Sequence, residues 1–144
     1  MKITCGIYLI NKQNELLICH PTNHSDSTWT IPKGVFDVDD ISYLNAAVRE
    51  LHEETNIKLN FEDIVQDIPI SLGSIKYKKS NKALVGFYAK LKINHNLFDL
   101  KCNSFFDIYD KKIPEVDDYK WVPIDDAYNL IHETQVTLLK DYLK

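Results

Sequence analysis

Three carboxylates lie close together near the middle of the chain, at Glu50, Glu53 and Glu54. Their spacing of i, i+3 and i+4 places them along one stripe if the segment is a helix. Like charges at this spacing repel each other and weaken a helix by roughly a few tenths of a kcal/mol. A divalent cation reverses that cost, so the stripe is a candidate metal site. A solvated acidic helix face is the alternative interpretation.

The segment before this helix supports a metal site. Ile31 precedes Pro32 and is therefore extended, and Gly34 has no Cβ to restrict its backbone. This freedom lets the backbone carbonyl of Lys33 turn toward the helix. Carboxylate and carbonyl oxygens are hard ligands that suit Mg²⁺ or Mn²⁺, and these ions keep several waters and share the phosphates of a substrate.

The stretch of residues 34–57 resembles the Nudix box, whose family pattern is G-x5-E-x7-R-E-U-x-E-E-x-G-U with U an apolar residue. The Nudix resemblance implies an α/β/α sandwich around a mixed sheet, and it covers nearly the whole chain. The residues that occupy their expected places are Gly34, Arg49, Glu50, Leu51, Glu53, Glu54 and Ile57.

The sequence departs from the Nudix pattern at three points. Asp40 stands where a Glu is usual, and one extra residue separates it from Arg49. The family resemblance implies that the acid braces the Arg, so Asp40 is the expected partner of Arg49 and Asp39 is the alternative. Asn56 stands where the last Gly is usual. Asn is the next best residue after Gly for a left-handed helix cap, so we expect Asn56 to end the helix.

A second informative stretch, PEVDDYKWV at residues 114–122, resembles a segment of the branch that contains dinucleoside polyphosphate hydrolases and RNA 5′-pyrophosphohydrolases. Trp29, shortly before Pro-Lys-Gly, is similar to the same branch. This resemblance implies that Glu115 is an additional metal ligand, whereas by itself Glu115 is a solvated loop residue. Residues 102–106 and Gln135 look most like a bacterial group described as predicted NTP pyrophosphohydrolases.

The resemblance implies an enzyme that hydrolyses a diphosphate linkage in a nucleoside diphosphate linked to another moiety, with a dinucleoside polyphosphate or NTP as the expected small-molecule substrate. Glu50 is the expected general base, with Glu54 next, and Arg49 is expected to orient the carboxylates through a bidentate pair. The alternatives are an RNA 5′-pyrophosphohydrolase and a non-catalytic nucleotide-binding or regulatory module. The expected ligands of Mg²⁺ or Mn²⁺ are Glu50, Glu53, Glu54, Glu115 and the Lys33 carbonyl.

Substrate-binding residues have a weaker signal in the sequence. Lys76 and Lys78 are candidates to hold distal phosphates, and a solvated hairpin tip is the alternative interpretation. Tyr77, Phe105 and Tyr109 are candidates for stacking on a nucleobase, although aromatic residues at strand spacing usually belong to a core.

Composition limits the classes of protein that fit this chain. At 144 residues, with 44% apolar and 26% charged residues, it is expected to form one domain over residues 1–144. The net charge of −4 argues against binding to DNA or a membrane surface, and it disfavours an RNA 5′ end as substrate. Cys5, Cys19 and Cys102 are widely spaced and are expected to be buried thiols in a reducing cytoplasm. No feature of the sequence indicates the oligomeric state.

The order of apolar runs predicts an α/β fold. Strands are followed by the acidic helix, by further strands and by a helical tail, which is typical of a sandwich around a mixed sheet. We expect strands over residues 3–10, 15–20, 29–31, 68–77, 83–91, 100–108 and 119–122, a helix through the acidic stripe, and a helical pattern from residue 123 to the end.

Overall fold

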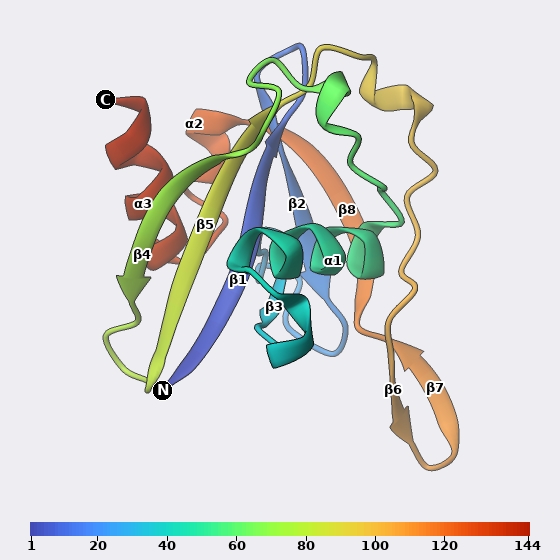
Figure 1. Ribbon diagram of the computed structural model, residues 1–144. Coiled ribbons are helices and arrows are strands. Elements are labelled where there is room, and N and C mark those ends of the chain that lie inside the picture. Colours follow the sequence, from blue (N-terminus) through green and yellow to red (C-terminus); the bar gives the residue numbers. More distant parts are fainter.

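A central mixed sheet organises the computed structural model, which describes residues 1–144 (Figure 1). Its strands are β1 (Lys2–Ile10), β2 (Glu15–Pro21), β3 (Lys33–Val35), β4 (Ile70–Lys76), β5 (Lys82–Lys90) and β8 (Val116–Pro123). A separate hairpin consists of β6 (Phe105–Ile108) and β7 (Lys111–Pro114). The α-helices are α1 (Tyr43–Thr55), α2 (Ile124–Ala127) and α3 (Glu133–Leu143). None of the helices is both long enough and apolar enough to cross a membrane.

The sheet has the strand order β4-β5-β1-β2-β8, and β3 pairs with β1 outside this path. β1 and β5 are parallel along their whole length, and the other pairs are antiparallel. The first half of β1 also pairs with β3, where Thr4 lies opposite Val35 and Gly6 lies opposite Lys33. The Lys33–Gly34 segment is therefore held against the centre of the sheet.

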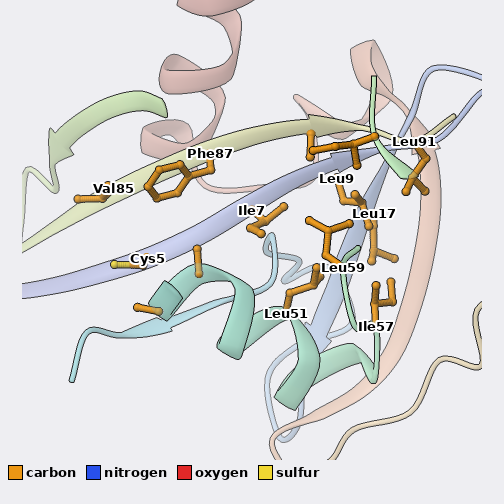
Figure 2. Close-up of a cluster of buried hydrophobic side chains, with 14 residues drawn as sticks. Cys5, Ile7, Leu9, Leu17, Leu51, Ile57, Leu59, Val85, Phe87 and Leu91 are labelled. Atoms are coloured by element: carbon orange, nitrogen blue, oxygen red, sulfur yellow. The ribbon is translucent and has the colours of Figure 1, made fainter. Parts of the chain in front are cut away.

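Alternation along the strands divides the apolar residues between two layers. Cys5, Ile7 and Leu9 of β1 pack with Leu51 of α1 on one face of the sheet (Figure 2). On the other face, Tyr8 belongs to a cluster that also includes residues of α2 and α3. Successive strand residues point to opposite faces, so a sheet buried on both sides needs continuous apolar strands. The predicted α/β/α sandwich around a mixed sheet is confirmed.

Three predicted elements differ in the structure. Residues 29–31 form isolated bridges to Cys19 and Ile131 rather than a strand. The strand expected over residues 100–108 is limited to β6, because the backbone N–H groups of Lys101 and Asn103 donate to carbonyls at the C-terminal end of α1. The helical tail is divided into α2 and α3, with an intervening segment that includes Leu130.

The cysteine prediction holds for two residues and is wrong for the third. Cys5 and Cys19 are fully buried, and all three cysteines are free thiols. Cys102 is only half-buried, because it lies in the irregular segment before β6 that runs past the end of α1, with its Sγ 3.1 Å from the carbonyl oxygen of Ser104.

Helix α1 has a well-defined cap at each end. The Ser42 hydroxyl accepts from the Asn45 N–H at the first turn. Asn56 ends the helix in the left-handed conformation, with φ of 68°, and its N–H donates to the His52 carbonyl. Its side chain also bonds to the Asp99 carbonyl and to Asn103. The prediction that Asn56 caps the helix is confirmed.

Replacing Asn56 with Ala should lower the free energy of unfolding by about 1–3 kcal/mol, because Ala is costly at positive φ and cannot replace the two side-chain hydrogen bonds. Asn56→Gly tolerates the backbone conformation and should lose less. Urea unfolding of the three proteins checks this order, and equal stability of the Ala and Gly variants would contradict it.

Candidate active site

One guanidinium holds the acidic cluster together. Arg49 donates from Nε and Nη2 to the two carboxylate oxygens of Asp40, at 2.6 and 2.9 Å. Its Nη1 donates to Glu50 at 2.8 Å and to Glu53 at 3.1 Å, and Nη2 also reaches the Val35 carbonyl at 3.2 Å. Hydrogen bonding to Arg49 lowers the pKa of the Asp40 carboxyl, and the pairing with Asp40 raises the pKa of Arg49. The bidentate pair of Arg49 is thus with Asp40.

A strained turn brings Asp40 to Arg49 in spite of the extra residue between them. The Ser42 N–H donates to the Asp40 carbonyl at 2.7 Å, which closes a three-residue γ-turn centred on Ile41. Ile41 has φ of 70° and an 88% exposed side chain. Positive φ is unusual for a β-branched residue. The turn shortens the path from Asp40 to α1, and Asp40 rather than Asp39 is the partner of Arg49.

Glu54 and Glu50 are both buried members of the stripe, and Glu54 has the larger change in pKa. Burial raises its pKa to about 8, against the opposing effect of the Lys33 N–H, which donates to the carboxylate at 3.0 Å. Burial also raises the pKa of Glu50. A Cβ on Gly34 would lie only 2.0 Å from the Glu50 carboxyl carbon, so any other residue at this position would displace the Glu50 carboxylate from its place beside β3.

Glu115 is the residue immediately before β8, and it adds a negative charge near the same cluster. It is exposed, and its charge contributes to the raised pKa values of Glu50 and Glu54. Its backbone is fixed by two hydrogen bonds, from its N–H to the Ser104 carbonyl and from the Thr22 N–H to its own carbonyl. Between β2 and β8 the register shifts beside it, and such irregularities commonly redirect a side chain.

The donor set fits a hard divalent cation in its chemistry, although its geometry is not preformed. All the donors are oxygens, and mutual repulsion and burial of the carboxylates favour a bound positive charge. No three His, Cys, Asp or Glu side chains are arranged so that they would hold a metal ion. The reason is that Arg49 binds oxygens of Glu50 and Glu53, while Glu54 accepts from Lys33.

A basic cleft of about 370 Å³ begins at the acidic cluster. Lys33 connects the two, because its N–H bonds to Glu54 while the residue also lines the cleft. No carboxylate lines it. A larger cavity of about 670 Å³ shares no residue with the cluster or the cleft. The twelve lining residues are Thr4, Pro21, His24, Thr28, Trp29, Thr30, Lys33, Tyr77, Ser80, Lys82, His132 and Gln135.

The structure separates the candidate substrate-binding residues. Tyr77 lines the cleft, whereas Lys76 and Lys78 do not, and the Lys78 ammonium lies 3.8 Å from Glu133. Phe105 and Tyr109 are exposed on the β6–β7 hairpin and are also absent from the lining.

The sequence reasoning did not identify Lys82, His132 and Gln135 as lining residues of a cleft. Lys82 lies in a lysine-rich stretch whose pattern in the sequence does not distinguish it from its neighbours. His132 and Gln135 lie far along the chain from Tyr77, and no spacing pattern relates them to it.

The sequence of this chain matches the model of one protein family. Residues 2–142 match the family model described as the NUDIX domain. An uncharacterized 17.7 kDa protein from the e-segB intergenic region of Enterobacteria phage T4 is 33% identical over 128 residues, which cover 84% of this chain and 82% of that protein. An RNA pyrophosphohydrolase of Pelagibacter ubique is 28% identical over 145 aligned residues, which cover 94% of this chain and 85% of that protein.

The fold also matches a solved structure, that of an Ap4A hydrolase from C. elegans in a binary complex. The TM-score is 0.68 at 23% identity, and the match covers 96% of this chain and 94% of that one. At this level of identity the likeness concerns the fold.

Replacing Ile41 with Gly should leave the protein as stable as the wild type or more stable by about 1 kcal/mol, because relief of the strained φ outweighs the added flexibility of the unfolded chain. The exposed side chain contributes little packing that the variant would lose. Thermal and urea unfolding measure the difference. A clear loss of stability would show that the Ile41 side chain contributes more than its turn costs.

Without metal, the free energy of unfolding should fall as pH rises from about 4.5 to about 8. Across that range the folded protein holds a proton on Glu54 that the unfolded chain has already released, since the pKa is raised from 4.5 to about 8. Glu54→Gln removes this contribution, while the other titrating groups are common to both proteins. Urea unfolding in EDTA at pH 5 and pH 8.5 should therefore show a smaller loss in the variant, and identical losses would contradict the assignment.

Proposed function

The chain belongs to the Nudix family of hydrolases, and from that membership we propose that it hydrolyses a diphosphate linkage in a dinucleoside polyphosphate or an NTP. The observation that carries the proposal is that the acidic cluster and the basic cleft share Lys33. An oxygen-rich acidic site suits a divalent cation, and a neighbouring site with cations and no carboxylate suits a polyanion.

The acidic residues divide into metal-holding and positioning roles. A bound Mg²⁺ or Mn²⁺ would offset the negative charge of the phosphates and make a water molecule a better nucleophile. The residues that would hold it are Glu50, Glu53, Glu54, Glu115 and the carbonyl of Lys33. Arg49 and Asp40 position Glu50 and Glu53 on the helix surface. Gly34 leaves the space that the Glu50 carboxylate occupies.

Proton transfer is assigned to the buried carboxylates. Glu50 is our first choice as general base and Glu54 the second. A base is most useful when its pKa lies near the working pH, a condition that both buried carboxylates approach. Burial raises the pKa of both groups toward neutrality. Arg49 holds Glu50 Oε1 at 2.8 Å and thereby limits the rotation of that carboxylate.

The cleft is the proposed binding site for the rest of the nucleotide. Lys33 and Lys82 place positive charge along it, and Tyr77 supplies an aromatic surface. The volume of about 370 Å³ lies within the range of small-molecule sites, roughly 300–1,000 Å³.

An RNA 5′-pyrophosphohydrolase is the second candidate, and the similarity to the Pelagibacter ubique protein favours it. Both reactions cleave a phosphoric anhydride and would use the same acidic cluster. They differ in what occupies the remaining surface, so a substrate panel separates them.

The test is product release with Mg²⁺ or Mn²⁺ from diadenosine polyphosphates, NTPs, nucleotide sugars and a short 5′-triphosphorylated RNA. We expect turnover of a dinucleoside polyphosphate or an NTP, and complete loss of turnover in EDTA. Glu53→Gln preserves the size of the side chain but removes a charge from the cluster, and it should reduce kcat/KM by roughly 100-fold or more.

Asp141→Asn is the matched control, because Asp141 is an exposed acid of α3 that lies outside both the acidic cluster and the lining of the cleft. It should keep wild-type activity, and all variants should unfold at similar temperatures. Activity of Glu53→Gln within severalfold of the wild type would refute the metal-site assignment. Turnover of RNA alone would select the second candidate, and binding without any turnover would indicate a regulatory module.

A further inference from the structure

Two rings from distant parts of the chain meet at the basic cleft. Tyr77 follows β4, and His132 is the residue immediately before α3. Their ring centroids are 5.3 Å apart, the rings are inclined by 54°, and both residues line the cleft. Because of this inclination, a flat molecule that stacks on the Tyr77 ring cannot also lie parallel to the His132 ring. The edge of a histidine carries its hydrogen-bonding nitrogens.

The helix cap determines which His132 nitrogen is available. Nδ1 lies 3.1 Å from the backbone nitrogen of Thr134, which carries a hydrogen and can only donate. Nδ1 is therefore the acceptor, and the ring proton is on Nε2. His132 offers a ligand one N–H donor in a fixed direction, and it offers no acceptor.

The first turn of α3 is held firmly, so this donor has a defined position. Gln135 accepts from the Ile31 N–H at 3.1 Å and donates to the Thr30 hydroxyl at 2.9 Å. The Tyr8 hydroxyl donates to the Gln135 carbonyl at 2.7 Å. The Gln135 side chain is thus held in place at both its oxygen and its nitrogen.

The side chains of fixed polarity that line the cleft are donors. Lys33 and Lys82 can only donate, as can His132 through Nε2, and there is no carboxylate in the lining. A keto oxygen on a nucleobase edge can accept from any of these three donors, whereas an exocyclic amino group cannot. The hydroxyl groups of the lining can pair with either, so they do not distinguish the two. Guanine and hypoxanthine carry the keto oxygen at C6, and adenine carries the amino group.

We propose that His132 determines base specificity, by donating from Nε2 to the C6 keto oxygen of a purine that stacks on Tyr77. The inference rests on the proposed function, since it takes the cleft as the place where the nucleoside part of the substrate binds. The favoured substrate class is then a nucleotide whose base is a 6-keto purine.

Inosine and adenosine nucleotides are the matched ligands for the test, because one carries the keto oxygen and the other the amino group at C6. We expect kcat/KM for ITP to exceed that for ATP by roughly tenfold. Calorimetric titration with IDP and ADP measures the same preference without turnover. If the enzyme proves to prefer dinucleoside polyphosphates, the diinosine and diadenosine compounds replace the triphosphates.

Three variants separate recognition from structure. His132→Ser keeps a side-chain oxygen that caps α3 but removes the ring, and it should abolish the preference for inosine. Tyr77→Leu should raise KM for both nucleotides and keep their ratio. Glu133→Gln changes the next residue, which lies outside the cleft lining, and it should behave as the wild type. Unfolding temperatures establish that each variant is folded.

The outcomes distinguish this inference from the proposed function. Hydrolysis of ITP and ATP with equal efficiency, or a preference that survives in His132→Ser, overturns the role of His132 and leaves the hydrolase intact. Tighter binding of IDP than ADP that depends on His132, without turnover of any substrate, supports the specificity role and overturns the catalytic proposal. A reproducible preference for adenine overturns the assignment of the donor.

Discussion

The cluster depends on one cation placed among several anions. Arg49 is the shared partner of Asp40, Glu50 and Glu53, and it divides its donors unequally among them. Asp40 accepts two hydrogen bonds from Arg49 and has a lowered pKa, so it stays charged and fixes the guanidinium. Glu50 and Glu53 receive one hydrogen bond each. The pairing offsets the repulsion within the acidic stripe, and the two helix carboxylates keep oxygens for a further ligand.

A close approach between β3 and α1 sets the geometry around that cation. The Lys33 N–H bonds to Glu54, and the absence of a Cβ at Gly34 makes room for Glu50. The pairing of β3 with the first half of β1 holds this backbone in place. On the opposite side, Leu51 and its neighbours attach α1 to the sheet. The acidic stripe is consequently confined between a fixed backbone and a packed core, and burial raises the pKa values of Glu50 and Glu54.

The basic cleft has a different origin, since it is assembled by the C-terminal helix. Gln135 connects α3 to the Thr30–Ile31 segment, which leads directly into Lys33. Tyr77 and His132 close the cleft on another side. The same few residues of α3 therefore border the cleft and brace the segment that leads to the acidic cluster. A chain with a net charge of −4 thus has a cleft without a carboxylate beside its acidic cluster.

Local patterns in the sequence determined the helix with its acidic stripe, the Asn56 cap and most of the central strands, because period, capping and spacing depend on residues close in the chain. Tertiary structure decided what those patterns leave open. Asp40 rather than Asp39 pairs with Arg49 because of a strained turn at Ile41. Lys101 and Asn103 bond to the end of α1 instead of forming a strand. The cleft depends on contacts between residues 30 and 135 and between residues 77 and 132, and no spacing rule predicts such contacts.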